Sequence, residues 1–191
     1  MSTRIPVGIR TCLTTEASEA PQFDENTLIR VYALHELHRL RQRKLTRGAL
    51  IDYHTRYKLV LLAHSQPEYR ELGPFVAAIH EWQDLDAFFT EYRLRLTHLL
   101  LNPATRRNHT NVLMHVQGYF RNQLDLRQRQ ELTSIIDNYR REAQPLLAPL
   151  MLLKHYMAEH PNTWLSGQRY FELWPAIWRL QGNDYFYQGV L

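Results

Sequence analysis

The stretch TRGALIDYHTRYKLVLLAHS, residues 46–65, decides the fold class. Its apolar side chains recur every three or four residues, which is the period of an amphipathic α-helix and not of a strand. They are Leu50, Tyr53, Tyr57, Val60 and Leu61. Thr46 stands where an N-cap is expected, because its hydroxyl can accept a hydrogen bond from a free N–H of the first turn. The stretch therefore predicts one long helix that buries a single face.

The chain beyond residue 23 repeats this pattern and contains no convincing strand. Helices are predicted over residues 24–44, 46–65, 67–82, 85–101, 105–122, 125–144 and 145–160. The last of these is apolar on most sides, so we expect it in the middle of a bundle, with Pro149 breaking or kinking its start. Eight aromatic residues within 164–187 favour a short terminal helix packed on the core. The sequence thus predicts an all-α fold, a single bundle of about seven helices followed by a short aromatic helix or tail.

Composition limits the class of protein. Of the 191 residues, 45% are hydrophobic and 22% are charged, as in globular domains. The one cysteine, Cys12, excludes an internal disulfide and a zinc site built on cysteines. No apolar run reaches the length of a membrane span, and residues 1–20 lack the apolar core of a secretory signal. We therefore expect a cytoplasmic protein without a membrane partner.

Charge is distributed unevenly along the chain, whose net charge is +4. Residues 24–66 carry eight basic and four acidic groups, and residues 93–130 carry seven and one. Between them, residues 67–92 carry six acidic groups and one arginine. Such segregation is typical of a surface that binds a polyanion, although each block can equally be a solvated helix face.

The stretch 46–65 contains an anomaly. His54 and Lys58 lie four residues apart, within the edge of its apolar arc. Burying an ammonium is costly unless it is paired, so Lys58 needs a carboxylate, a set of carbonyls or an anionic ligand. From the residues alone, a structural network and a ligand site are both open.

Residues 105–122 supply a second group of basic side chains. Arg106 and Arg107 stand at the expected N-terminus of this helix, where free N–H groups favour anions. Lys154, near the end of the last long helix, can join the same cluster or simply interact with its own helix dipole. These residues are our candidates for phosphate contacts.

The two faces of the same predicted helix differ. His109 lies over its apolar face, whereas Asn111, His115 and Gly118 lie on the opposite face. A glycine inside a helix is unfavourable, so Gly118 suggests that another group approaches closely there.

Sharper catalytic signals are missing from the sequence. His35-Glu-Leu-His38 is one residue short of the zinc-protease spacing, and no glycine-rich phosphate loop or nucleophile elbow is present. The ten histidines include no trio with ligand spacing. We therefore expect neither a metal nor a cofactor, and no hydrolytic or phosphoryl-transfer activity is supported.

Several of these stretches are found together in one known family. Residues 24–191 closely resemble the YbgA family, bacterial helical domains of unknown function. The resemblance rests on the runs YHTRYK at 53–58, NHTNVLMH at 108–115, GYF at 118–120, LKHY at 153–156 and QRY at 168–170. Many relatives have histidine where this chain has Tyr57, so the resemblance implies no role for a histidine there.

The resemblance also implies a function. In many family members the helical domain follows an iron–sulfur domain associated with removing sulfur from 4-thiouridine in tRNA, and the helical part is the RNA-binding half. Residues 5–13, IPVGIRTCL, resemble the first strand of that desulfurase, including its first cluster cysteine. One thiolate cannot hold a cluster. We therefore expect residues 1–22 to be a truncated, poorly ordered remnant and residues 23–191 to be the helical domain, without desulfurase activity.

The leading hypothesis is a non-catalytic domain that binds structured RNA, with tRNA as the class that the resemblance implies. It would act beside a separate desulfurase or another tRNA-modification protein. The proposed phosphate contacts are Arg56, Lys58, Arg106, Arg107 and Lys154, and the proposed polar contacts are His54, His109, Asn111 and His115. Two alternatives stay open: an enzyme or small-anion-binding domain with a His/Lys pocket, and a protein–protein adaptor that uses the aromatic tail or the acidic residues 67–92.

Overall fold

The computed structural model describes residues 24–180, with side chains as far as Ile177. These residues form helices and no strand, which confirms the all-α prediction for this part of the chain. The α-helices are α1 (Glu25–Lys44), α2 (Arg47–His64), α3 (Gln66–Ala77), α4 (Leu85–Leu101), α5 (Arg106–Tyr119), α6 (Leu126–Arg140), α7 (Leu147–Glu159), α8 (Thr163–Ser166) and α9 (Tyr170–Leu180). A 3-10 turn, η1 (Ala78–Glu81), follows α3. The strand and the remnant expected within residues 1–22 lie outside the described residues.

Side-chain caps fix where most helices begin. Asp24 and Thr46 accept hydrogen bonds from backbone N–H groups three residues on, and Asp125 forms a capping box with Gln128. Pro149 does not break α7, contrary to expectation. It lies in the first turn, where a backbone N–H has no helical partner to lose.

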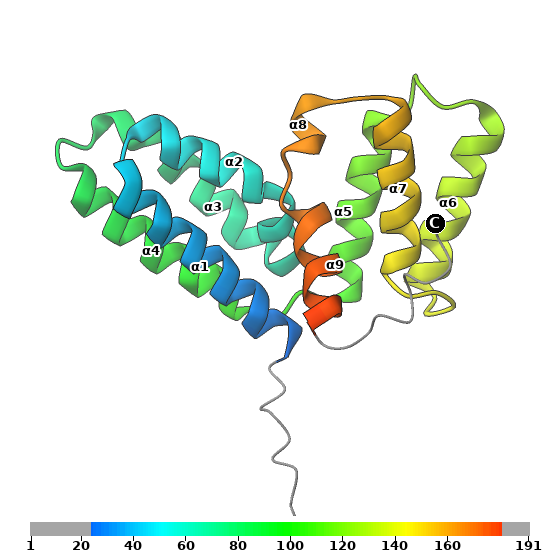
Figure 1. Cartoon of the computed structure of the whole chain (residues 1–191), viewed down its shortest axis with the longest axis horizontal. Coiled ribbons are helices and arrows are strands. Elements are labelled where there is room, and N and C mark those ends of the chain that lie inside the picture. Colours follow the sequence, from blue (N-terminus) through cyan, green and yellow to red (C-terminus); the bar gives the residue numbers. More distant parts are fainter. Residues whose placement is uncertain (1–23, 181–191) are drawn as a thin grey trace, which may run out of the picture.

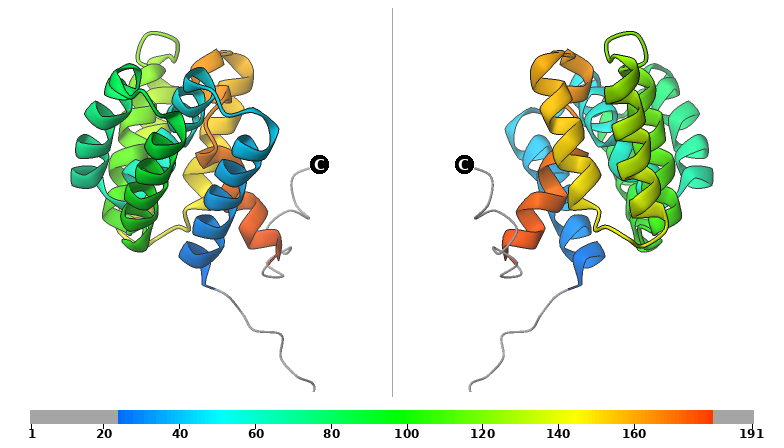
Figure 2. Two further views of the ribbon diagram at one scale, coloured as in Figure 1. Left: turned by 90° about the vertical axis from the view of Figure 1, so that its left-hand side faces the viewer. Right: turned by 90° about the vertical axis from the view of Figure 1, so that its right-hand side faces the viewer.

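The helices form two groups. In Figure 1, α1–α4 lie on one side and α5–α7 on the other, with α8 and α9 between them. Figure 2 looks along the line that joins the two groups, so that one group lies in front of the other. Helix α2 contacts α3 and α4 in its own group and also α5 and α9. It therefore joins the two groups.

The apolar composition of residues 145–160 predicts α7 in the middle of the bundle. The central helix is instead α2. Nine residues of α2 are buried. By contrast, α7 leaves Lys154 and His155 exposed and packs mainly on α6. A helix of high apolar content can lie at the side of a bundle because surfaces retain much apolar area.

The aromatic segment after residue 163 packs as predicted, as far as the structure describes it. Tyr170, Phe171 and Trp174 of α9 are buried. Helix α9 thereby contacts α1, α2 and α7 and closes the space between the two groups.

Candidate nucleic-acid interface

A groove of about 200 Å³ lies between α2, α3 and α5, and we call it the Lys58 groove. Its lining residues are Lys58 and Leu62 of α2, Gln66, Tyr69 and Arg70 of α3, and Asn111, Val112 and His115 of α5. None of them is acidic. The groove therefore brings together three side chains that the sequence analysis proposed from separate stretches, Lys58, Asn111 and His115.

Among the described residues, Lys58 has neither the carboxylate nor the set of carbonyls that burial of its ammonium was expected to require. It is only partly buried, and it forms no ion pair with any described residue. Its Nζ atom lies 5.4 Å from the ring centroid of Trp164 on α8, and Trp164 stacks on Tyr119 at 5.0 Å. A cation–π contact attracts the ammonium without neutralising it. Lys58 therefore faces the groove without a carboxylate partner among the described residues.

A second groove, of about 340 Å³, lies on the other side of α5, and we call it the Arg107 groove. Its lining residues are Arg106, Arg107, Thr110, Asn111 and Met114 of α5 and Arg140 near the end of α6. Again none is acidic. Asn111 lines both grooves, so the two meet across one helix and form a continuous surface.

Within the Arg107 groove the two predicted arginines play different parts. Arg107 is exposed and has no ion pair among the described residues. Arg106 is held in the fold: its guanidinium lies 4.5 Å from the ring centroid of Tyr139 and donates a hydrogen bond to the Tyr139 carbonyl oxygen. Its Nε atom is 3.6 Å from a carboxylate oxygen of Glu142. Arg106 thus joins α5 to the end of α6, and Arg107 is the arginine that remains free to bind a ligand.

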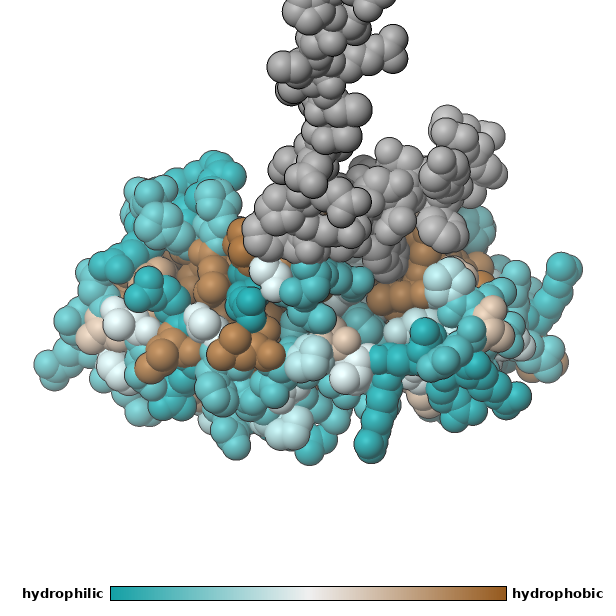
Figure 3. Space-filling view, turned by 90° about the horizontal axis from the view of Figure 1, so that it is seen from below, coloured by the Kyte–Doolittle hydropathy of each residue, from teal (hydrophilic) through white to brown (hydrophobic). Residues whose placement is uncertain are grey.

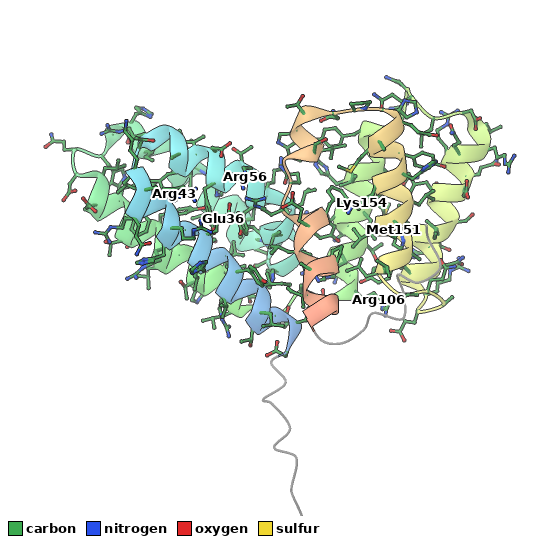
Figure 4. All side chains as sticks on the ribbon, in the orientation of Figure 1. Glu36, Arg43, Arg56, Arg106, Met151 and Lys154 are labelled. Carbon is green, nitrogen blue, oxygen red and sulfur yellow. The ribbon has the colours of Figure 1, made fainter. Side chains whose placement is uncertain are left out.

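Arg56 belongs to a structural network rather than to either groove. Its Nη2 atom lies 2.7 Å from Oε1 of Glu36, and Nη2 of Arg169 lies 2.6 Å from the same oxygen. The hydroxyl of Tyr57 donates to the other carboxylate oxygen at 2.8 Å. Figure 4 shows Glu36 and Arg56 side by side between α1 and α2. This Glu36 cluster (Glu36, Arg56, Tyr57 and Arg169) leaves Arg56 occupied, which contradicts its assignment as a free phosphate contact.

His54 and His109 are buried in the core. His54 stacks on Tyr69 at 5.6 Å, and its Nδ1 atom is hydrogen-bonded to the Tyr92 hydroxyl at 3.3 Å. Burial, and to a lesser degree the nearby charge of Lys58, lowers the pKa of His54 to about 4. The Nδ1 atom of His109 is hydrogen-bonded to the Tyr170 hydroxyl at 2.9 Å, and burial lowers its pKa to about 3. Both are neutral packing groups at pH 7 and not surface contacts.

The remaining predictions divide similarly. His115 is exposed beside Lys58 in the groove, and partial desolvation and the Lys58 charge lower its pKa. Lys154 is exposed on α7, and Figure 4 places it away from both Arg56 and Arg106. Gly118 is not required by a close neighbour, because a Cβ atom there would meet nothing within 4 Å. The inference of a close approach at Gly118 was therefore wrong.

The described part of the aromatic tail, as far as Ile177, offers little surface for an adaptor. Its described members Tyr170, Phe171 and Trp174 are buried, and Trp164 is partly covered by Tyr119, which stacks on it, and by Lys58. The view from below shows hydrophobic patches on the sides of both groups of helices, surrounded by hydrophilic side chains (Figure 3). Within residues 24–180, no helix is long and apolar enough to cross a membrane, and no three or more His, Cys, Asp and Glu side chains are grouped to hold a metal ion.

Comparison with known proteins agrees with the resemblance in the sequence. Residues 58–175 match the model of a family described as "Protein of unknown function (DUF1722)". The matched residues include all those that line the two grooves. The chain is also 66% identical over 170 residues to "Uncharacterized protein YbgA" of Escherichia coli (strain K12), a match that spans 89% of this chain and 98% of that protein. The chain therefore belongs to the YbgA family of uncharacterized proteins. No solved structure matches it.

Proposed function

We propose that this protein binds structured RNA through the surface of α5 that carries the Lys58 and Arg107 grooves. One observation carries the proposal: neither groove has a carboxylate among its lining residues. By comparison, the larger groove between α1, α2 and α9 contains Glu36, Asp52 and Glu172. A polyanion is repelled by carboxylates, so the surface of α5 is the more favourable of these sites.

The free cations support the same surface. Lys58, Arg70 and Arg107 line the two grooves, and none of them forms an ion pair with a described residue. Phosphate contacts of this kind supply most of the affinity of non-specific nucleic-acid binding. That the RNA is tRNA, and that the protein acts beside a desulfurase or another tRNA-modification protein, is inferred from the family resemblance in the sequence.

The test is a fluorescence-anisotropy titration of the protein with total tRNA over a series of salt concentrations. Lys58→Met keeps the apolar stem of the side chain, and Arg107→Ala removes an exposed group, so both variants should fold. We expect each to weaken binding and to reduce the slope of log affinity against log salt by about 1. The matched control is Arg93→Ala, because Arg93 is an exposed arginine on α4 that forms no ion pair with the described residues. The proposal fails if tRNA does not bind at low salt, or if Arg93→Ala weakens binding as much as Arg107→Ala does.

The alternative of a small-anion pocket keeps one supporting observation, the unpaired charge of Lys58. The side chains proposed for this pocket do not converge, since His54 and His109 are buried in the core and Lys154 lies on α7. The full proposed set is His54, Lys58, His109, His115 and Lys154. A calorimetric titration with inorganic phosphate separates the two functions. Saturable phosphate binding that Lys58→Met removes, in a protein that does not bind tRNA, would favour the anion pocket.

A further inference from the structure

The Lys58 groove contains more than cations. Tyr69 forms one of its walls, and the buried His54 stacks on that ring at an interplanar angle of 4°. His54 does not line the groove, so it supports the tyrosine from the protein side. A ring supported in this way stands ready to stack with a flat ligand, because base–aromatic stacking needs one accessible face.

Two side-chain amides lie in the same groove. Gln66 begins α3 and Asn111 lies on α5, so they approach from different helices, and both are exposed. Neither side chain forms a hydrogen bond with a described residue. Amides combine a donor and an acceptor in one plane, which suits them to the edge of a nucleobase.

The size and charge of the groove limit the ligand further. Its volume of about 200 Å³ is smaller than the roughly 300–1,000 Å³ of pockets that enclose drug-sized molecules. This space suits a single base better than several nucleotides. Lys58 and Arg70 place positive charge at the same groove, and Asn111 connects it to Arg107, so cations are available for phosphates on both sides of the base.

We propose that the Lys58 groove binds one unpaired nucleotide of the RNA, with its base stacked on Tyr69 and its edge hydrogen-bonded by Gln66 and Asn111. This inference rests on the proposed RNA-binding function and names what that surface recognises. Proteins that read RNA sequence commonly take up bases from loops and bulges, since the deep groove of paired RNA is closed to side chains. The site would therefore select RNA with an extruded base over a continuous duplex.

The experiment compares three RNAs that share one sequence: a blunt duplex, the duplex with one bulged nucleotide, and the duplex with an abasic residue at the bulge. Fluorescence anisotropy at a fixed salt concentration gives the three affinities. We expect the bulged RNA to bind about tenfold tighter than the duplex, and the abasic bulge to lose most of this gain, as stacking of one base predicts. The abasic RNA keeps the additional backbone unit of the bulge and lacks only the base, so the comparison reports the contribution of the base.

Variants identify the groove. Tyr69→Leu should remove the preference for the bulge, whereas Tyr69→Phe should keep it, and melting curves check that both fold. Gln66→Ala and Asn111→Ala alter exposed side chains and should each reduce the preference several-fold with unchanged affinity for the duplex. Equal binding of the intact and abasic bulges would overturn the inference while leaving RNA binding in place. If neither the three RNAs nor tRNA bind, the proposed RNA-binding function itself is refuted.

Discussion

Acid should destabilise this protein well before its carboxylates are protonated. His54 and His109 are buried and neutral, with pKa values lowered to about 4 and about 3. An unfolded chain exposes both imidazoles, whose ordinary pKa is about 6.5. At pH values between the folded and the unfolded pKa, the unfolded state binds a proton at each histidine and the folded state does not. The stability is therefore fully present above pH 6.5 and is lost as the pH falls.

The magnitude follows from the same shifts. Each such histidine lowers the free energy of unfolding by about 1.4 kcal/mol for each pH unit below 6.5, until its folded pKa is reached. Two together give about 3 kcal/mol between pH 6.5 and pH 5. This is a large fraction of the roughly 5–15 kcal/mol by which domains are stable. His64 adds to the effect, because burial also lowers its pKa.

Urea unfolding at a series of pH values between 7 and 5 measures this slope, and His109→Gln identifies one of its sources. The glutamine leaves a polar group near the Tyr170 hydroxyl but cannot be protonated. The variant should be less stable at pH 7 through lost packing on Trp174, yet its stability should fall less steeply, by about one proton, as the pH is lowered. Parallel pH profiles for the wild type and the variant would refute the reasoning that His109 is buried and neutral.

Three further predictions concern single positions. Glu36→Gln should lower the free energy of unfolding by about 1–2 kcal/mol, because Arg56 and Arg169 lose the carboxylate that they share and keep only Asp52 and Glu172 as acidic partners; urea titration measures this, and wild-type stability would contradict it. Arg106→Ala should lower the free energy of unfolding by about 1 kcal/mol, because Arg106 is packed on Tyr139, and Arg107→Ala should leave it almost unchanged. Equal melting temperatures for the two variants would show that the contact with Tyr139 is unimportant. Gly118→Ala should stabilise α5 by about 0.5–1 kcal/mol, because space for the methyl group is open; a lower melting temperature would mean that the glycine is required.

Local chemistry made much of the fold predictable. Helix starts at Asp24, Thr46 and Asp125 were readable because capping involves residues only three apart in the chain. The position of α7 could not be predicted from the sequence. The apolar content of a helix indicates that the helix is partly buried, but it does not indicate where in the bundle the helix lies. The split of the third predicted helix into α3 and η1 was also missed, since a change of helical pitch has no strong sequence signal.

The candidate site was predictable in part for the same reason. Lys58 stood out because it broke the apolar arc of its own helix. Its partner, Trp164, comes from a short helix more than a hundred residues later, and no local pattern connects the two. Glu36 was missed altogether, although it engages Arg56 and Arg169, because ion pairs between distant segments depend on the finished packing. Tyr69 and Arg70 escaped notice within a segment whose acidic character dominated its interpretation.

The Glu36 cluster also constrains the order in which the chain can reach its final form during synthesis. Glu36 and Arg56 leave the ribosome early, whereas Arg169 follows only after α1–α8 have been made. Until then, the surface that α9 covers on α1, α2 and α7 faces water, and half of the positive charge around Glu36 is absent. Through most of its translation, the nascent chain therefore lacks α9, the helix that completes the bundle. Docking of α9 is the late step that completes it, and a chaperone that binds exposed apolar helices would have this interval in which to act.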